Sequence, residues 1–186
     1  MLNNIAVFCA SHIGRNPKFQ SAAQMFGRLI ASQHRTLVYG GSNLGYMGTV
    51  STAALDGGAR VVGIIPTLFS EEIINSQPRA EVVRVGSMQE RKSRMIACCD
   101  GFVALPGGVG TLDEISEVLM SNQLRICCKP MGLLNIDGFF DPFLLLMKKM
   151  KEEELVRSNM DNIIIVDDDP ERLLARLDAF VPDVED

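Results

Sequence analysis

A glycine-rich stretch followed by two carboxylates is the part of this sequence best suited to chemistry. Residues Pro106–Glu114 read PGGVGTLDE. The apolar run before them, Gly101–Leu105, is typical of a strand buried on both faces, and the apolar residues of Leu112–Leu124 repeat with helical spacing. The first N–H groups of a helix have no partner within it, and the helix dipole makes that end partly positive. We therefore expect Gly108–Thr111 to bind an anion, most naturally a phosphate, beside the two carboxylates.

Two common phosphate motifs do not account for this stretch. The dinucleotide fingerprint requires a third glycine, where this sequence has Asp113. The P-loop requires Gly-Lys-Ser/Thr, which occurs neither here nor in the second glycine-rich stretch, Gly40–Gly48. A plain strand-to-helix turn without a ligand is the alternative, but three glycines and a threonine before an acidic helix start favour anion binding.

Length and composition favour a single domain formed by residues 1–186. The apolar content of 47% and the charged content of 22% are ordinary for a soluble globular protein, and no apolar run is long enough to span a membrane. The first residues lack the features of a signal peptide, so we expect a cytoplasmic protein. A net charge of −5 argues against nucleic acids and anionic membranes as partners, so the phosphate is expected to belong to a small molecule.

The number and spacing of the cysteines also fit the expected cytoplasmic location. The five cysteines are an odd number in a chain without a recognisable export signal, and we expect them to be reduced. Their two adjacent pairs lack the spacing of zinc ligands, so the sequence predicts no metal site. The residues concerned are Cys9, Cys98, Cys99, Cys127 and Cys128.

Strand and helix patterns alternate along the chain. This alternation predicts right-handed β-α-β units, and therefore an α/β fold with a doubly wound, mainly parallel sheet that has helices on both faces. The expected strands are Ile5–Cys9, Thr36–Tyr39, Arg60–Ile65, Ala80–Val85, Gly101–Leu105, Lys129–Asn135 and Ile163–Val166. Three helices are expected to begin at Pro17, at Gly86 or Ser87, and at Leu112. A further helix is expected to end at Gly57, and two more to span Phe143–Met150 and Pro170–Phe180.

Three of the expected strands end in small or glycine-rich loops. These loops are Ala10–Gly14, Gly40–Gly48 and Gly107–Thr111. Ligands of open parallel sheets bind beyond the carboxyl ends of the strands, so the three loops are expected to line one crevice. The regular alternation breaks between Pro66 and Val85, and this segment is a candidate lid.

The motifs resemble those of the Lonely Guy family. The family signature combines Pro106-Gly107-Gly108-x-Gly110-Thr111-x-x-Glu114 with Met88-x-x-Arg91-Lys92 upstream. Further matches follow in order over nearly the whole chain: Tyr39-Gly40-Gly41, Gly45-x-Met47-Gly48, Ile64-Ile65-Pro66 and Lys129-Pro130-Met131-Gly132. Both signatures at this spacing are a specific match, although related carrier proteins share the glycine loop.

The resemblance implies a Rossmann-like fold and an enzyme. Members of the family, often mislabelled lysine decarboxylases, are cytokinin riboside 5′-monophosphate phosphoribohydrolases. They release the free base and ribose 5-phosphate from adenosine 5′-monophosphates such as AMP or N6-isopentenyl-AMP, without cofactor or metal, as dimers or higher homo-oligomers. By position, Arg91 and Glu114 match the catalytic pair. The implied substrate-binding residues are Glu72, Arg91, Lys92, Gly107, Gly108, Val109, Gly110, Thr111, Leu112, Asp113 and Glu114.

Two departures from the family pattern concern the ligand crevice. The first loop reads Cys9-Ala10-Ser11-His12 where the family usually has Cys-Gly-Ser-Ser, and Met120-Ser121 replaces Thr-Trp. Both changes bear on which base is preferred, plain adenine or its N6-prenylated form. We expect His12 to hydrogen-bond within its loop rather than to act in catalysis.

Glycosidic cleavage gives each charged residue a role. The reaction passes through an oxocarbenium-like sugar, which a carboxylate stabilises while it orients or deprotonates the attacking water. Glu114 is the expected carboxylate, with Arg91 as its ion-pair partner or as a substrate contact, and Asp113 is turned about 100° away on the helix. Lys92 suits phosphate or ribose, and Glu117, on the same face as Glu114, is a candidate contact to the base.

Other functions compete with this one. A non-catalytic nucleotide or cofactor carrier with the same phosphate loop is the main alternative, but it has no need of a carboxylate beside the sugar. Taken alone, Arg91 and Glu114 also suit a structural ion pair. An amino-acid decarboxylase fits poorly, because no lysine other than Lys92 has a setting suited to a Schiff base.

Overall fold

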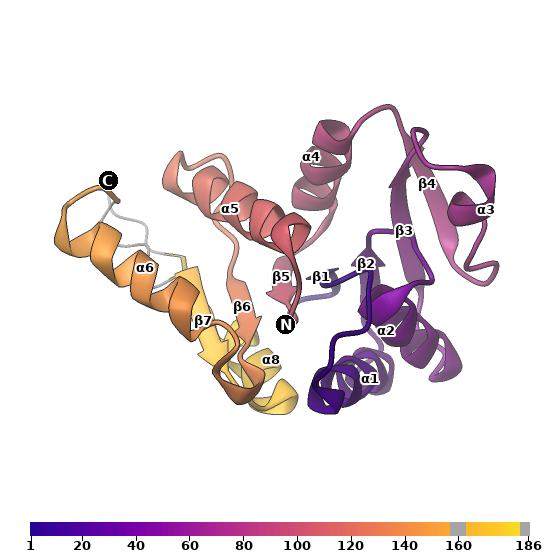
Figure 1. Ribbon diagram of the computed structural model, residues 1–186, viewed down its shortest axis with the longest axis horizontal. Helices are drawn as coiled ribbons and strands as arrows, with labels where there is room; N and C mark the ends of the chain where they lie inside the picture. The colour runs from indigo at the N-terminus through magenta and orange to yellow at the C-terminus, as the bar shows by residue number, and fades with distance from the viewer. Residues whose placement is uncertain (157–162, 183–186) are drawn as a thin grey trace.

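The computed structural model describes residues 1–156 and 163–182 and shows one seven-stranded sheet, parallel throughout, in the order β4-β3-β2-β1-β5-β6-β7 (Figure 1). The predicted doubly wound α/β fold is therefore confirmed. The strands are β1 (Asn4–Phe8), β2 (Thr36–Tyr39), β3 (Val61–Pro66), β4 (Glu81–Val85), β5 (Gly101–Ala104), β6 (Met131–Leu134) and β7 (Ile164–Asp167).

Helices cover both faces of the sheet. They are α1 (Pro17–Ser32), α2 (Gly45–Asp56), α3 (Glu71–Ile74), α4 (Met88–Cys98), α5 (Val109–Gln123), the 3-10 turn η1 (Ile136–Gly138), α6 (Asp141–Glu152) and α8 (Pro170–Asp178). Alternate side chains of each strand point to opposite faces. Ile5 and Val7 of β1 join a core with α1, α2 and α8, whereas Ala6 and Phe8 join a second core with α4, α5 and α6. None of the described helices is long and apolar enough to cross a membrane.

The strand order reverses next to β1. The chain leaves β1 toward β2 on one side, and β5 returns to the other side, where Ile5 pairs with Gly101 and Phe8 with Ala104. The loops after β1 and β5 consequently run to helices on opposite faces of the sheet. A crevice opens between such loops at the carboxyl ends of the strands, which is where ligands of this fold class bind.

Two helices begin earlier than their sequence patterns predicted. Helix α2 starts at Gly45, so the second half of the expected loop Gly40–Gly48 is its first turn. Glycine disfavours a helix, but Tyr46 and Val50 are buried against α1, and this packing outweighs the propensity. Helix α5 starts at Val109 rather than at Leu112.

The irregular segment between Pro66 and Val85 contains one helical turn that the sequence did not predict. Helix α3 occupies Glu71–Ile74, and the Ser70 hydroxyl accepts a hydrogen bond from the Ile73 N–H as its cap. The side chain of Ile74 is buried and fixes the turn beside the sheet. In Figure 1, α3 lies against β4 at the edge of the molecule.

Candidate active site

A cavity of about 560 Å³ lies at the carboxyl ends of the central strands. All three predicted loops contribute to it, as expected from the parallel sheet. The irregular segment, expected from the sequence to be a lid, supplies further apolar lining through Phe69 and Ile73. The lining residues are Cys9, Ala10, Ser11, His12, Gly40, Ser42, Leu44, Met47, Ile65, Phe69, Ile73, Met88, Arg91, Gly108, Val109, Gly110, Thr111 and Glu114.

The N-terminus of α5 opens into this cavity. Gly108 is its N-cap and no side chain caps the helix, so the first N–H groups have no partner there. A Cβ added at Gly108 or Gly110 would meet nothing within 4 Å, which shows open space in front of the backbone. A Cβ at Gly107 would instead overlap the buried Thr111 side chain. This helix end therefore presents the row of donors that an anion requires.

The N-terminus of α2, which also begins in a glycine-rich stretch, already has a hydrogen-bond partner within the protein. The carbonyl of Ala10 accepts hydrogen bonds from the N–H groups of Tyr46 (3.0 Å) and Met47 (3.4 Å). Gly45 has φ +58°, and a Cβ there would overlap the backbone of Ser11 and His12. The loop after β1 thus caps α2, and α5 is the helix end that remains for a ligand.

Arg91 of α4 and Glu114 of α5 form a buried ion pair in the cavity wall. The guanidinium NH2 group donates to Oε1 of Glu114 at 2.6 Å, and the two side chains are only 9% and 7% exposed. Gly40 at the end of β2 makes this approach possible, because a Cβ there would lie 2.5 Å from NH2 of Arg91. The Nε atom of Arg91 is buried and has no hydrogen-bond partner among the described residues.

Burial sets the protonation of the groups around this pair. Desolvation raises the pKa of Glu114 to about 7, and the opposing attraction of Arg91 does not offset it. Glu114 therefore exchanges its proton near neutral pH, as a general acid or base must. Burial, followed by the neighbouring Glu114, also raises the pKa of the Cys9 thiol, which stays neutral and is unsuited to nucleophilic attack.

Lys92 and Asp113 pair with each other instead of lining the cavity. The Lys92 ammonium binds Asp113 at 2.9 Å and Glu117 at 3.0 Å, and its side chain is 11% exposed. Burial lowers the pKa of Lys92, but its hydrogen bonds to the two carboxylates outweigh burial and the net shift is upward. These bonds tie α4 to α5 and so support the neighbouring Arg91–Glu114 pair.

Several other predicted site residues also lie outside the cavity wall. Glu72 is an exposed residue of α3, and its neighbours Phe69 and Ile73 line the cavity instead. Leu112 is 41% exposed on α5 and, like Gly107, is not part of the lining. The sequence did not single out Phe69 and Ile73, because no regular pattern places the irregular segment relative to the sheet.

His12 lies in the cavity wall, and its Nδ1 is 3.1 Å from the Ser11 hydroxyl. This contact is the hydrogen bond within the loop that the sequence led us to expect. The His12 imidazole thus lines the same cavity as the open N-terminus of α5. The Lonely Guy pattern has a serine at the position of His12.

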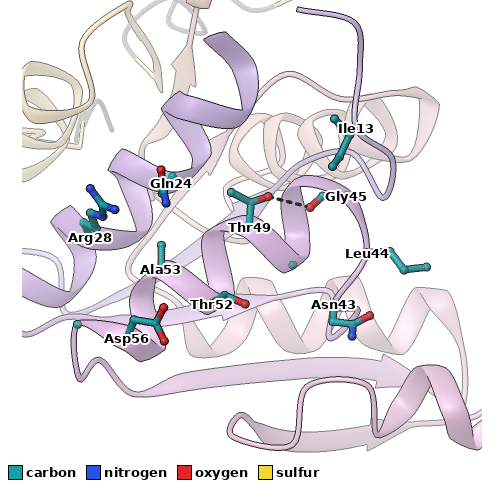
Figure 2. Close-up of a pocket in the computed structure, with 12 residues that line it drawn as sticks. Ile13, Gln24, Arg28, Asn43, Leu44, Gly45, Thr49, Thr52, Ala53 and Asp56 are labelled. Carbon is teal, nitrogen blue, oxygen red and sulfur yellow. Dashed lines mark hydrogen bonds between the residues drawn. The ribbon is translucent and has the colours of Figure 1, made fainter. Parts of the chain in front are cut away.

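A second cavity, of about 590 Å³, lies between α1 and α2 (Figure 2). Gln24 and Arg28 border it from α1, and Thr49 and Asp56 from α2. The Thr49 hydroxyl donates to the Gly45 carbonyl, and Asp56 already pairs with Arg79. Its lining holds neither an open helix N-terminus nor a buried ion pair, so the cavity at α5 is the candidate active site.

Known proteins resemble this chain in sequence. Residues 47–177 match the family described as possible lysine decarboxylase. The chain is 41% identical over 181 residues to cytokinin riboside 5′-monophosphate phosphoribohydrolase LOG of Oryza sativa subsp. japonica. This match covers 97% of this chain and 75% of that protein. The chain is 40% identical over 182 residues to cytokinin riboside 5′-monophosphate phosphoribohydrolase LOG2 of Arabidopsis thaliana, covering 98% and 85%.

Solved structures resemble it in fold. The Moco carrier protein of Chlamydomonas reinhardtii superposes with a TM-score of 0.73 at 19% identity, over 97% of this chain and 98% of that one. The molybdenum cofactor binding protein of Rippkaea orientalis gives a TM-score of 0.70 at 22% identity, over 96% and 97%. At these identities the likeness concerns the fold alone.

Proposed function

This chain belongs to the family of cytokinin riboside 5′-monophosphate phosphoribohydrolases, whose family model carries the description possible lysine decarboxylase, and from that membership we propose its reaction. The protein hydrolyses the N-glycosidic bond of adenosine 5′-monophosphates, including N6-modified ones. The products are the free base and ribose 5-phosphate.

The observation that carries this proposal is the buried Arg91–Glu114 pair beside the open N-terminus of α5. A phosphate bound by the N–H groups of Val109, Gly110 and Thr111 would fix the attached ribose close to the Glu114 carboxylate. Binding energy at the phosphate is thereby converted into positioning of the sugar, which lowers the barrier to cleavage.

Glu114 acts on the sugar and on water. In its ionised form it stabilises the positive charge that develops on the ribose as the bond to the base breaks, and it accepts a proton from the attacking water. Arg91 donates to one carboxylate oxygen at 2.6 Å, and in the part of the chain that the structure describes no group donates to the other oxygen, which in this proposal faces the reacting atoms.

The base is assigned to the apolar side of the cavity. Its apolar lining is formed by Met47, Ile65, Phe69, Ile73 and Met88, none of which belongs to the loop after β5. An adenine ring, or an adenine with an apolar N6 substituent, gains contact area against such a surface. Met88 therefore lines the substrate cavity in this proposal, although its helical spacing alone suits a core residue.

The protein is proposed to be a homodimer or higher homo-oligomer, as its family resemblance implies. Met120 of α5 and Leu124, its C-cap residue, lie about one helical turn apart, and each is 54% exposed. Apolar side chains gathered on one helix face are typical of subunit interfaces. We also place it in the cytoplasm, a reducing compartment in which its five free cysteines are stable.

The test is release of free base. Purified protein is incubated with AMP and, separately, with N6-isopentenyl-AMP, and the products are separated by chromatography. We expect base and ribose 5-phosphate from the intact protein and none from Glu114→Gln. Glu171→Gln is the control, because it alters an exposed carboxylate in the first turn of α8, outside the cavity lining. Bound nucleotide without any release of base from the intact protein would establish the carrier instead.

A further inference from the structure

Two adjacent thiols stand at the C-terminal end of α4. Cys98 is the last residue of the helix and is exposed, whereas Cys99 is the C-cap residue and is buried. Their Sγ atoms are 3.7 Å apart, which is hydrogen-bonding distance for sulfur. An exposed thiol is thus held beside a protected one.

Two cations act on the outer thiol. The hydrogen bond from Cys99, with further help from Arg94 and Lys129, outweighs partial burial and lowers the pKa of Cys98 to about 7. The hydrogen bond to Cys98 and burial together raise the pKa of Cys99, which stays a thiol. Lys129 is fixed in place, because its ammonium donates to the Ile96 carbonyl at 2.6 Å. At neutral pH about half of the outer sulfur is therefore thiolate, and the inner one retains its proton.

We propose that Cys98 and Cys99 form a redox modification site, in which a hydroperoxide reversibly converts the two thiols into a disulfide. The Cys98 thiolate attacks the terminal oxygen of the peroxide and the O–O bond breaks. The product is a sulfenic acid at Cys98, and the other peroxide oxygen leaves as alkoxide or hydroxide, which takes a proton from the solvent to give the alcohol or water. The Cys99 sulfur then displaces the sulfenic hydroxyl, which leaves as water with the Cys99 proton. Sulfur loses two electrons overall and the peroxide gains them, and a thiol reductant reverses the step.

The other cysteines provide internal controls. Cys9 is buried with a raised pKa, and burial likewise raises the pKa of Cys127. Cys128 is exposed but has no sulfur contact comparable to that of Cys98 among the described residues. The site proposed here therefore depends on the pairing of Cys98 with Cys99, and not on the presence of two cysteines in a row.

The expected rate advantage is moderate. Near pH 7 about half of Cys98 is ionised, whereas an ordinary cysteine is ionised to a few per cent at most. A lower pKa also makes a thiolate less nucleophilic, and this offsets part of the gain. The two effects together leave Cys98 roughly fivefold more reactive than an ordinary exposed cysteine.

The test is peroxide treatment of the folded protein followed by alkylation and mass spectrometry of tryptic peptides. Trypsin separates the two cysteine pairs, because Arg94, Arg125 and Lys148 provide cleavage sites around them and Pro130 protects the bond after Lys129. We expect the peptide spanning residues 95–125 to lose two hydrogen atoms and to escape alkylation, roughly fivefold faster than Cys128 reacts. Reductant should restore both thiols.

Two variants separate the steps. Cys99→Ser should accumulate a sulfenic acid at Cys98 that a dimedone probe traps, and Cys98→Ser should leave Cys99 reduced under the same treatment. The proposal is overturned if Cys128 reacts as fast as Cys98, if Cys99 is oxidised in Cys98→Ser, or if the product is a disulfide between two chains on a non-reducing gel. Intact thermal unfolding curves for both variants would show that folding is not the cause of a lost reaction.

Discussion

Substitution of Glu114 by glutamine should change how the stability of the protein depends on pH. Glutamine has the shape of a protonated glutamic acid but cannot ionise. The pKa of Glu114 rises from 4.5 to about 7 in the folded protein, chiefly because the side chain is buried. A change of one pKa unit corresponds to about 1.4 kcal/mol, so ionisation of Glu114 destabilises the folded state by about 3 kcal/mol relative to the unfolded chain.

The sign follows from proton binding. Between pH 4.5 and about 7 the folded protein retains the Glu114 proton while the unfolded chain releases it. The free energy of unfolding therefore falls as pH rises across this window. The stabilising contribution of the protonated group is complete below pH 4.5 and is lost as pH rises through about 7. Glu114→Gln lacks this loss. We therefore expect its free energy of unfolding to equal that of the wild type near pH 4.5 and to exceed it by about 3 kcal/mol above about pH 7.

Urea unfolding of both proteins, followed by circular dichroism across this pH window, measures the effect. The difference between the two free energies cancels the titration of every other group, provided that the urea dependence m is the same in both proteins. A difference that does not change with pH would refute the raised pKa. A variant that becomes less stable than the wild type as pH rises would show that attraction to Arg91 outweighs burial, and that Glu114 is permanently ionised.

Three glycine substitutions test the packing around the site and beneath it. Gly40→Ala places a Cβ 2.5 Å from NH2 of Arg91, so we expect kcat/KM for AMP to fall at least about tenfold with little change in melting temperature. Gly108→Ala meets no atom within 4 Å in the protein, so melting should be unaffected while KM rises, because the methyl group faces the incoming phosphate; an unchanged KM would remove the phosphate from this loop. Gly27→Ala should lower the melting temperature by several degrees without altering activity per folded molecule, since its Cβ would overlap the Val50 carbonyl, a clash larger than the gain of about 1 kcal/mol in helix propensity. Calorimetry and steady-state kinetics on the same preparations separate the two kinds of effect.

The strands were predictable because a parallel sheet buried on both faces leaves a strong record in sequence. Strand β2 has the predicted bounds, Thr36–Tyr39. The ends of the other strands lie within two residues of their predicted positions. The start of α2 was not predictable in the same way. Local propensity at Gly45 and Gly48 opposes a helix. Contacts with segments remote in sequence stabilise this first turn, namely packing on α1 and hydrogen bonds to the Ala10 carbonyl.

The sequence predicted that the glycine loop, Arg91 and Glu114 would lie together, but it did not predict the apolar lining, and Lys92 and Asp113 do not line the cavity. The glycine loop and the helix after it are local features, so their sequence specifies both the open N–H groups and the carboxylates. The apolar wall is not local, because Phe69 and Ile73 reach the cavity through the course of the irregular segment after β3. Their residue types alone indicate nothing more than partial burial.

The structure gives a physical reason why Arg91 and Glu114, the pair singled out from the sequence, differ from the neighbouring pair of Lys92 and Asp113. Arg91 and Lys92 are neighbours on α4, and Asp113 and Glu114 are neighbours on α5, so the helical turn of about 100° per residue sends the members of each couple in different directions. Packing against the sheet places Arg91 with Glu114 in the cavity wall, while Lys92 meets Asp113, which is 53% exposed. Desolvation raises the pKa of the buried Glu114 carboxylate to about 7. The division of labour between two similar ion pairs thus arises from their depth in the fold, and exchanging their burial would exchange their chemistry.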